Sequence, residues 1–127
     1  MPVPLVETFP VAFIEGYHAH VYYADSTERA IAAAIREAAQ ASFELVIGRW
    51  RDEPVGPHPL PMYQIAFGPD VLPAFLPWLL SVRGPLSILV HTRTGVSDLT
   101  DHTAGAMWLG KPLELKLEFF DRDGKSA

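Results

Sequence analysis

Cysteine is absent from this sequence of 127 residues. The chain can therefore form no disulfide, offers no thiolate nucleophile and cannot build a cysteine-based zinc site. Any metal that it binds must be held by histidine, carboxylate or water. The sequence also lacks an apolar run of about 18 residues, which a membrane-spanning helix requires. Its N-terminus does not show the charged and then apolar order of a secretory signal. We expect a cytoplasmic protein with no membrane partner.

Positive charge is scarce as well, because 10 Lys and Arg residues stand against 15 Asp and Glu residues, giving a net charge of −5. Nucleic acid is not expected as a partner, since phosphate backbones are bound by basic faces. Hydrophobic residues make up 49% of the chain and charged residues 20%, which is typical of a globular protein. The length favours one domain over 1–127, with an N-terminal arm (1–14), a core (15–91) and a C-terminal extension (92–127).

Strands and helices alternate in the hydrophobic pattern. We predict strands over 15–23, 43–50, 62–67 and 86–91. We also predict a helix that is capped by Asp25 or Ser26 and ends at about residue 42, and a second helix over 71–82. A proline-rich loop fills 51–61. Beyond the fourth strand, the pattern predicts a short helical segment over 101–108 and a last edge strand over 113–120.

This order predicts an α+β protein with the ferredoxin-like βαββαβ plan, an antiparallel sheet in strand order 4-1-3-2 with two helices on one face. We expect the first and third strands to form a parallel central pair, with the fourth strand beside the first in the opposite sense. The other face of the sheet must be covered by the tails, by a partner subunit or by a ligand. Because Met62, Leu89 and the tyrosines are expected on that face, we predict a homodimer.

The five histidines of the chain are its strongest functional signal. In a strand, His18 and His20 project from one face together with Tyr22. The other three lie in the proline-rich loop (His58), at the end of the fourth strand (His91) and beyond it (His102). In the predicted topology, all of these places meet at one end of the sheet. Each histidine alone can be an ordinary hydrogen-bonded residue, but their convergence favours a shared metal site.

Four motifs occur in the order YHAHVYY (17–23), PVGPHP (54–59), ILVHTRTG (88–95) and DHTAGAMWLG (101–110). Together they resemble the DOPA 4,5-dioxygenase family, small extradiol-type dioxygenases of fungi and bacteria. The resemblance covers about residues 17–110. It implies a ferredoxin-like fold, a non-haem Fe(II) cofactor, and ring opening of a catechol such as DOPA or caffeate with O₂. In a purified sample, another divalent metal such as zinc can take the place of iron.

The resemblance also implies that the metal ligands come from His18, His20, His58 and His91. The exact three stay open. We assign the metal to His18, His20 and His91 and the acid–base role to His58 or His102, because an imidazole with a pKa near 6.5 can exchange the catechol proton. Tyr22 is expected to orient substrate or O₂, with sheet packing as its alternative role. If a carboxylate ligates the metal, it is Glu15 or Asp101.

Two other functions remain open. The chain can be a dimeric ferredoxin-like domain that binds a small molecule without catalysis, in which case the histidines only form hydrogen bonds. It can also be another metal enzyme, such as a zinc-dependent hydrolase or isomerase. The architecture does not separate these functions, since it hosts many chemistries. Arg93 can meet a substrate carboxylate and Trp108 can stack on a ring, although a solvated arginine and a core tryptophan are their ordinary roles.

Overall fold

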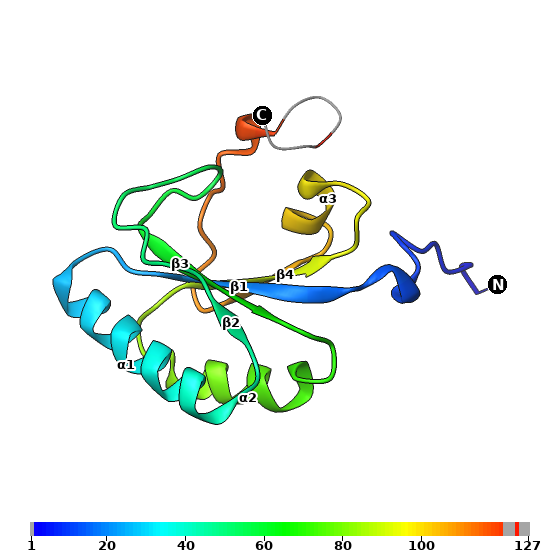
Figure 1. Ribbon diagram of the computed structural model, residues 1–127. Coiled ribbons are helices and arrows are strands. Elements are labelled where there is room, and N and C mark those ends of the chain that lie inside the picture. The colour runs from blue at the N-terminus through cyan, green and yellow to red at the C-terminus, as the bar shows by residue number, and fades with distance from the viewer. Residues whose placement is uncertain (1, 121–123, 125–127) are drawn as a thin grey trace.

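A five-stranded antiparallel sheet forms the centre of the computed structural model, which describes residues 2–120 and 124. The strands, in the spatial order β2-β3-β1-β4-β5, are β1 (Gly16–Tyr22), β2 (Val46–Ile47), β3 (Met62–Phe67), β4 (Ile88–Arg93) and β5 (Ala106–Leu109). Helices α1 (Ser26–Ser42) and α2 (Leu72–Val82) cover one face, and the short helix α3 (Asp98–His102) lies on the other side (Figure 1). The predicted α+β class is confirmed, and the order is consistent with a ferredoxin-like plan.

The two central strands run antiparallel, so the prediction of a parallel pair is wrong. Tyr17 lies opposite Phe67, and Tyr22 lies opposite Met62. The reason is the chain path: β1 and β2 run in the same direction because α1 crosses back between them, and β3 then reverses against β2. The chain therefore enters β3 beside the end of β1, away from the start of β1 where His58 was expected.

Capping at the start of α1 follows the sequence pattern. Asp25 accepts a hydrogen bond from the Glu28 backbone N–H at 2.9 Å, and the Glu28 carboxylate accepts one from the Ala24 N–H at 2.9 Å. This reciprocal arrangement satisfies two donors that a helix start leaves free. Ala32 and Ala39 are buried against the sheet. Small side chains at these places let α1 lie close to the strands.

Alternate side chains of β1 point to opposite faces of the sheet. One face packs on α1 and α2, and the other, which we call the open face, carries neither of these helices. Ala19 and Val21 are buried in the main core, between the sheet and helices α1 and α2. His18, His20 and Tyr22 therefore project from the opposite, open face, as the period of two predicts. On that face Tyr22 belongs to a second apolar cluster, whose buried members are Tyr22, Met62 and Leu89.

Segments of the same chain cover the open face. Leu60, Trp108, Leu113 and Leu115 pack against the second cluster, and the Lys116 N–H donates to the Pro57 carbonyl at 2.8 Å. Met62 and Leu89 are thus buried without a second subunit. This removes the reason given for a homodimer, which stays a prediction.

Three predicted elements differ from those observed. The second strand pairs over Val46–Ile47 only, although the Gly48 N–H still donates to Gln64 and Arg51 forms an isolated bridge with Met62. The helix predicted over 101–108 is wrong, because α3 ends at His102, a turn follows over 103–105, and β5 begins at Ala106. The strand predicted over 113–120 is wrong too. That segment lies on the open face and ends in a 3-10 helix, Leu117–Phe119.

The N-terminal segment ahead of β1 contains a single turn of 3-10 helix, Val11–Phe13, within its described residues. In Figure 1 it extends away from the sheet, and Val3, Leu5 and Val6 are exposed. Among the described residues, no helix is long and apolar enough to cross a membrane.

Candidate metal centre

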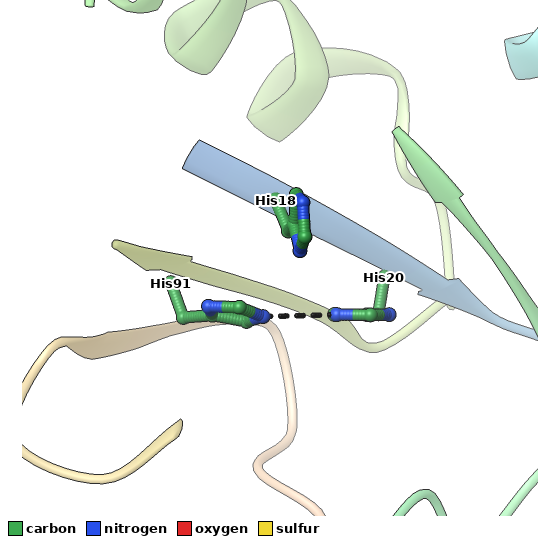
Figure 2. Close-up of side chains that lie close together, drawn as sticks. All are labelled: His18, His20 and His91. Carbon is green, nitrogen blue, oxygen red and sulfur yellow. Dashed lines mark hydrogen bonds between the residues drawn. The ribbon is translucent and has the colours of Figure 1, made fainter. Parts of the chain in front are cut away.

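Neighbouring strands bring His18, His20 and His91 together on the open face (Figure 2). His18 and His20 come from β1, and His91 of β4 is the register partner of His18. The Nε2 atoms of His20 and His91 are 3.0 Å apart. Possible ligand atoms of all three residues lie within 4.8 Å of one another. Antiparallel pairing therefore gathers the three residues that the sequence suggested as metal ligands.

His58 and His102 reach the same place from two connecting segments. The loop 51–61 folds back over the open face, so that the His58 ring lies 4.2 Å from the His20 ring, centroid to centroid. His102, the last residue of α3, has its ring 4.1 Å from that of His91. All five histidines of the chain therefore form one cluster. Their predicted convergence is confirmed, although His58 arrives by a different route.

Backbone carbonyls fix the tautomers of two of these rings. His91 Nδ1 lies 2.8 Å from the Thr92 carbonyl oxygen, and His102 Nδ1 lies 2.7 Å from that of Asp98. A carbonyl oxygen can only accept, so each Nδ1 carries the proton and donates it. The Nε2 atom of each neutral ring is then left with its lone pair. Metal-binding histidines in proteins are commonly oriented in this way.

His20 is almost completely buried. Its side chain is 3% exposed, and its Nδ1 has no hydrogen-bond partner among the described residues. An unpartnered buried nitrogen costs roughly 1–3 kcal/mol. With metal–nitrogen bonds of about 2.1 Å, neighbouring ligand nitrogens lie about 2.9–3.4 Å apart, depending on the coordination geometry. The 3.0 Å between the Nε2 atoms of His20 and His91 fits this spacing. The residues present therefore suit a divalent metal ion.

Burial keeps the imidazoles neutral. It lowers the pKa of His58 to about 4, with a smaller effect of His102. Burial likewise lowers the pKa of His91 to about 3 and that of His18 to about 4, and the Arg93 charge adds to the effect on His18. The pKa of His20 is held well below its usual value by burial and by the neighbouring rings. At neutral pH the cluster thus offers lone pairs to a cation.

Tyr22 lies beside His58, with 2.6 Å between its hydroxyl oxygen and His58 Nδ1. Burial raises the pKa of Tyr22 above its usual range, so the phenol stays protonated. Its other face stacks on Trp108 at 5.9 Å between ring centroids. Trp108 belongs to the second apolar cluster, and it also lines a second cavity together with His102.

The two candidate carboxylates are placed differently. Asp101 is buried and accepts hydrogen bonds from the Thr92 hydroxyl at 3.0 Å and the Thr94 hydroxyl at 2.7 Å. It also accepts one from the Thr94 N–H at 3.2 Å. Glu15 is exposed at the cavity wall. Within the described residues, the sets of possible ligand atoms that lie within 4.8 Å of one another contain histidines alone.

Changing Asp101 to Asn should lower the free energy of unfolding by roughly 1–3 kcal/mol, because the amide group meets the Thr94 N–H with a donor where an acceptor stood. Asp101 joins the end of β4 to α3, and these elements carry His91 and His102. Urea denaturation measures the change. Asp70→Asn, at an exposed carboxylate, is the matched control and should change the stability by less than about 0.5 kcal/mol. Equal stability of the two variants contradicts the prediction.

A cavity of about 560 Å³ opens beside the histidines. This volume is within the usual range for small-molecule sites. Its wall includes all five histidines, Arg93 of β4 and two aromatic residues near the end of the described chain, Phe119 and Phe120. The Phe120 ring lies 5.1 Å from that of His102. Sequence reasoning missed both phenylalanines as cavity residues, and the alternating pattern over 113–120 was the signal that this segment has a buried side.

Fold and site together define a small α+β protein with a histidine cluster on the open face of its sheet. The chain matches the model of the Dopa 4,5-dioxygenase family over residues 17–119. It belongs to that family.

Three similar proteins were found, and two of them carry the name of a dioxygenase. The chain is 31% identical to the DOPA 4,5-dioxygenase of Amanita muscaria over an alignment of 112 residues. This alignment covers 82% of this chain and 49% of the Amanita protein. It is 43% identical, over 86 residues, to an uncharacterized 21.2 kDa protein of Botryotinia fuckeliana, covering 62% and 47%. The crystal structure of a candidate dioxygenase from Nostoc punctiforme matches with a TM-score of 0.84 and 46% identity, covering 88% of this chain and 96% of that one. The chain spans about half the length of the two curated relatives.

Proposed function

We propose that the protein is a non-haem iron dioxygenase that opens the ring of a catechol, such as DOPA or caffeate, with O₂. The observation that carries the proposal is the cluster of five neutral histidines on the wall of the 560 Å³ cavity. Membership in the Dopa 4,5-dioxygenase family supports the same chemistry. Both atoms of O₂ enter the product when a ring bond breaks, so the reaction consumes no further reductant.

His18, His20 and His91 would hold the Fe(II), since they come from rigid neighbouring strands and lie within ligand distance of one another. Bound there, Fe(II) would supply the redox and Lewis-acid chemistry of the reaction. His18 is only partly buried and lines the cavity, so this set faces the space that a substrate can enter.

His102 is the stronger of the two acid–base candidates. Its Nδ1 is committed to the Asp98 carbonyl, which leaves the Nε2 lone pair to take a proton from a catechol hydroxyl. His58 is hydrogen-bonded to Tyr22 through Nδ1, so these two side chains would orient the substrate or pass on a proton.

Arg93 is the single arginine or lysine on the cavity wall among the described residues. It would bind the carboxylate of a substrate such as DOPA or caffeate, because a guanidinium pairs well with a carboxylate. The homodimer, the cytoplasmic location and the use of iron rather than zinc stay predictions.

Oxygen uptake tests the proposed function. The protein is loaded with Fe(II) without air, mixed with a panel of catechols that includes L-DOPA and caffeate, and then exposed to O₂. We expect O₂ consumption together with a yellow ring-opened product. His18→Ala should reduce both to background, because a metal ligand is lost beside the cavity. Leu80→Ala, at an exposed place on α2, is the control and should keep full activity.

Two outcomes of this experiment contradict the proposal in different ways. Stoichiometric iron without O₂ uptake on any catechol favours another metal enzyme, such as a zinc-dependent hydrolase or isomerase. A chain that binds no iron favours a binding domain whose histidines only form hydrogen bonds.

A further inference from the structure

The histidine cluster contains two overlapping sets of three possible ligands. His18, His20 and His91 form the first set. His20, His58 and His102 form the second, and in each set the possible ligand atoms lie within 4.8 Å of one another. His20 is the shared member, and it is almost completely buried.

The protonation of His20 allows only one of its nitrogens to act as a ligand at a time. Its Nε2 faces the Nε2 of His91 at 3.0 Å, and its Nδ1 is buried without a partner among the described residues. A neutral imidazole has one N–H and one lone pair. Because His91 Nδ1 donates to Thr92, its Nε2 has a lone pair, and the His20 Nε2 donates its proton to that lone pair in the metal-free chain. The His20 Nδ1 then carries the lone pair, and the proton has to move to Nδ1 before Nε2 can act as a ligand.

We propose that the centre has two alternative metal positions that share His20 and are occupied one at a time by a single divalent cation. The first position uses His18 and His91 with His20. The second uses His58 and His102 with His20. Two dications held only by neutral rings would repel each other strongly over so short a distance. The inference requires that the histidines bind a metal, and it holds whether or not the protein is a dioxygenase.

Each position has its own advantage. In the second set, His58 is oriented by the Tyr22 hydroxyl and His102 by the Asp98 carbonyl, whereas in the first set His91 alone is oriented in this way, by Thr92. Outer partners of this kind strengthen metal binding. The first position is formed by paired strands, which hold its ligands rigidly, but it lies nearer the Arg93 charge that acts on His18.

Occupation of the second position has a chemical consequence. It makes ligands of His58 and His102, which the proposed function uses for proton transfer. It leaves His18 and His91 without a metal on the cavity wall. Only protein with the metal in the first position would then be active under the proposed function, and the distribution of the ion between the positions would set the active fraction.

Cobalt(II) binding to the full chain tests the inference, with the metal content measured by mass spectrometry, the affinity by competition with a chelator, and the ligand field by visible absorption. We expect one Co(II) per chain. The double variant His58→Ala/His102→Ala retains the first position, and His18→Ala/His91→Ala retains the second. Each should bind one Co(II), with different absorption spectra, and the wild-type spectrum should be a weighted sum of the two.

His20→Ala removes the shared ligand, and His91→Ala/His102→Ala removes one ligand from each set. Loss of a group that only hydrogen-bonds a metal ligand lowers metal affinity by up to roughly 100-fold. Each of these two variants loses a ligand itself, so its Co(II) affinity should fall by more than that. Circular dichroism and thermal melting show whether each variant is folded. If His20→Ala does not fold, the crossed double variant, which keeps His20, gives the same test.

Three results would overturn the inference. They are two Co(II) ions per wild-type chain, loss of binding in either of the doubles that retain one position, and full binding by folded His20→Ala. Failure of the proposed function gives a different result from these three. The chain would then bind one metal ion, shared between the two positions, but would show no O₂ uptake on any catechol.

Discussion

Replacing His102 with glutamine should lower kcat for ring opening by about 10²–10⁴-fold, the usual contribution of a positioned acid or base. Glutamine keeps a polar group of similar length but has no basic nitrogen. In the native chain the Asp98 carbonyl holds the proton on Nδ1, so His102 presents a lone pair at Nε2 beside the cavity. Steady-state O₂ uptake on saturating catechol, together with the iron content of the same sample, measures the effect.

Iron content separates the chemical role of His102 from a binding role. We expect His102→Gln to keep its iron, because the set of His18, His20 and His91 is intact. His58→Gln is the matched variant, since His58 also lines the cavity but its Nδ1 faces the Tyr22 hydroxyl. An unchanged kcat in His102→Gln would refute the assignment, and a large loss in His58→Gln alone would transfer the role to His58.

Replacing Phe75 with alanine should reduce the free energy of unfolding by about 3–5 kcal/mol, the usual cost of such a truncation in a packed core. Phe75 of α2 is 0% exposed. Its ring centroid lies 4.9 Å from that of Phe67 in β3 and 5.0 Å from that of Phe43, which follows α1. The ring therefore joins both helices to the sheet. Urea or thermal denaturation gives the change.

Leu80→Ala is the matched control for Phe75→Ala. Both residues lie on α2 and lose a large apolar side chain, but Leu80 is 52% exposed. We expect a change within about 0.5 kcal/mol. Equal losses in the two variants would contradict the packing described for Phe75.

Long regular elements could be predicted from the sequence because local signals agree there. The observed α1 is capped by Asp25, one of the two residues expected there, and ends at Ser42, close to the expected end. The alternation through His18, His20 and Tyr22 placed these three side chains on one face of β1. The order of the first four strands agrees with the predicted order 4-1-3-2, whereas β5 was not expected over 106–109.

Features that depend on distant contacts could not be predicted. The cap of α3 is Ser97, which accepts from the Thr100 N–H at 3.0 Å, so the helix starts before Asp101 and leaves Ala106–Leu109 free to pair with β4. The route of His58 depends on the loop 51–61 folding over the sheet, where Tyr22 meets His58 and Lys116 meets Pro57. No local pattern encodes the contacts of His58 and Lys116, whereas the Ser97 cap is a local signal that the prediction of a helix over 101–108 overlooked.

The distance along the chain between paired strands decides when the centre can form during synthesis. His20 and His91 are separated by 71 residues, and β1 pairs only with strands that follow it at a distance. The ribosome must release the chain beyond His102 before all five histidines can gather. A nascent chain therefore cannot select its metal early. Under the proposed function, the complete set of metal ligands is present only in a chain that has been synthesised through β4 and α3.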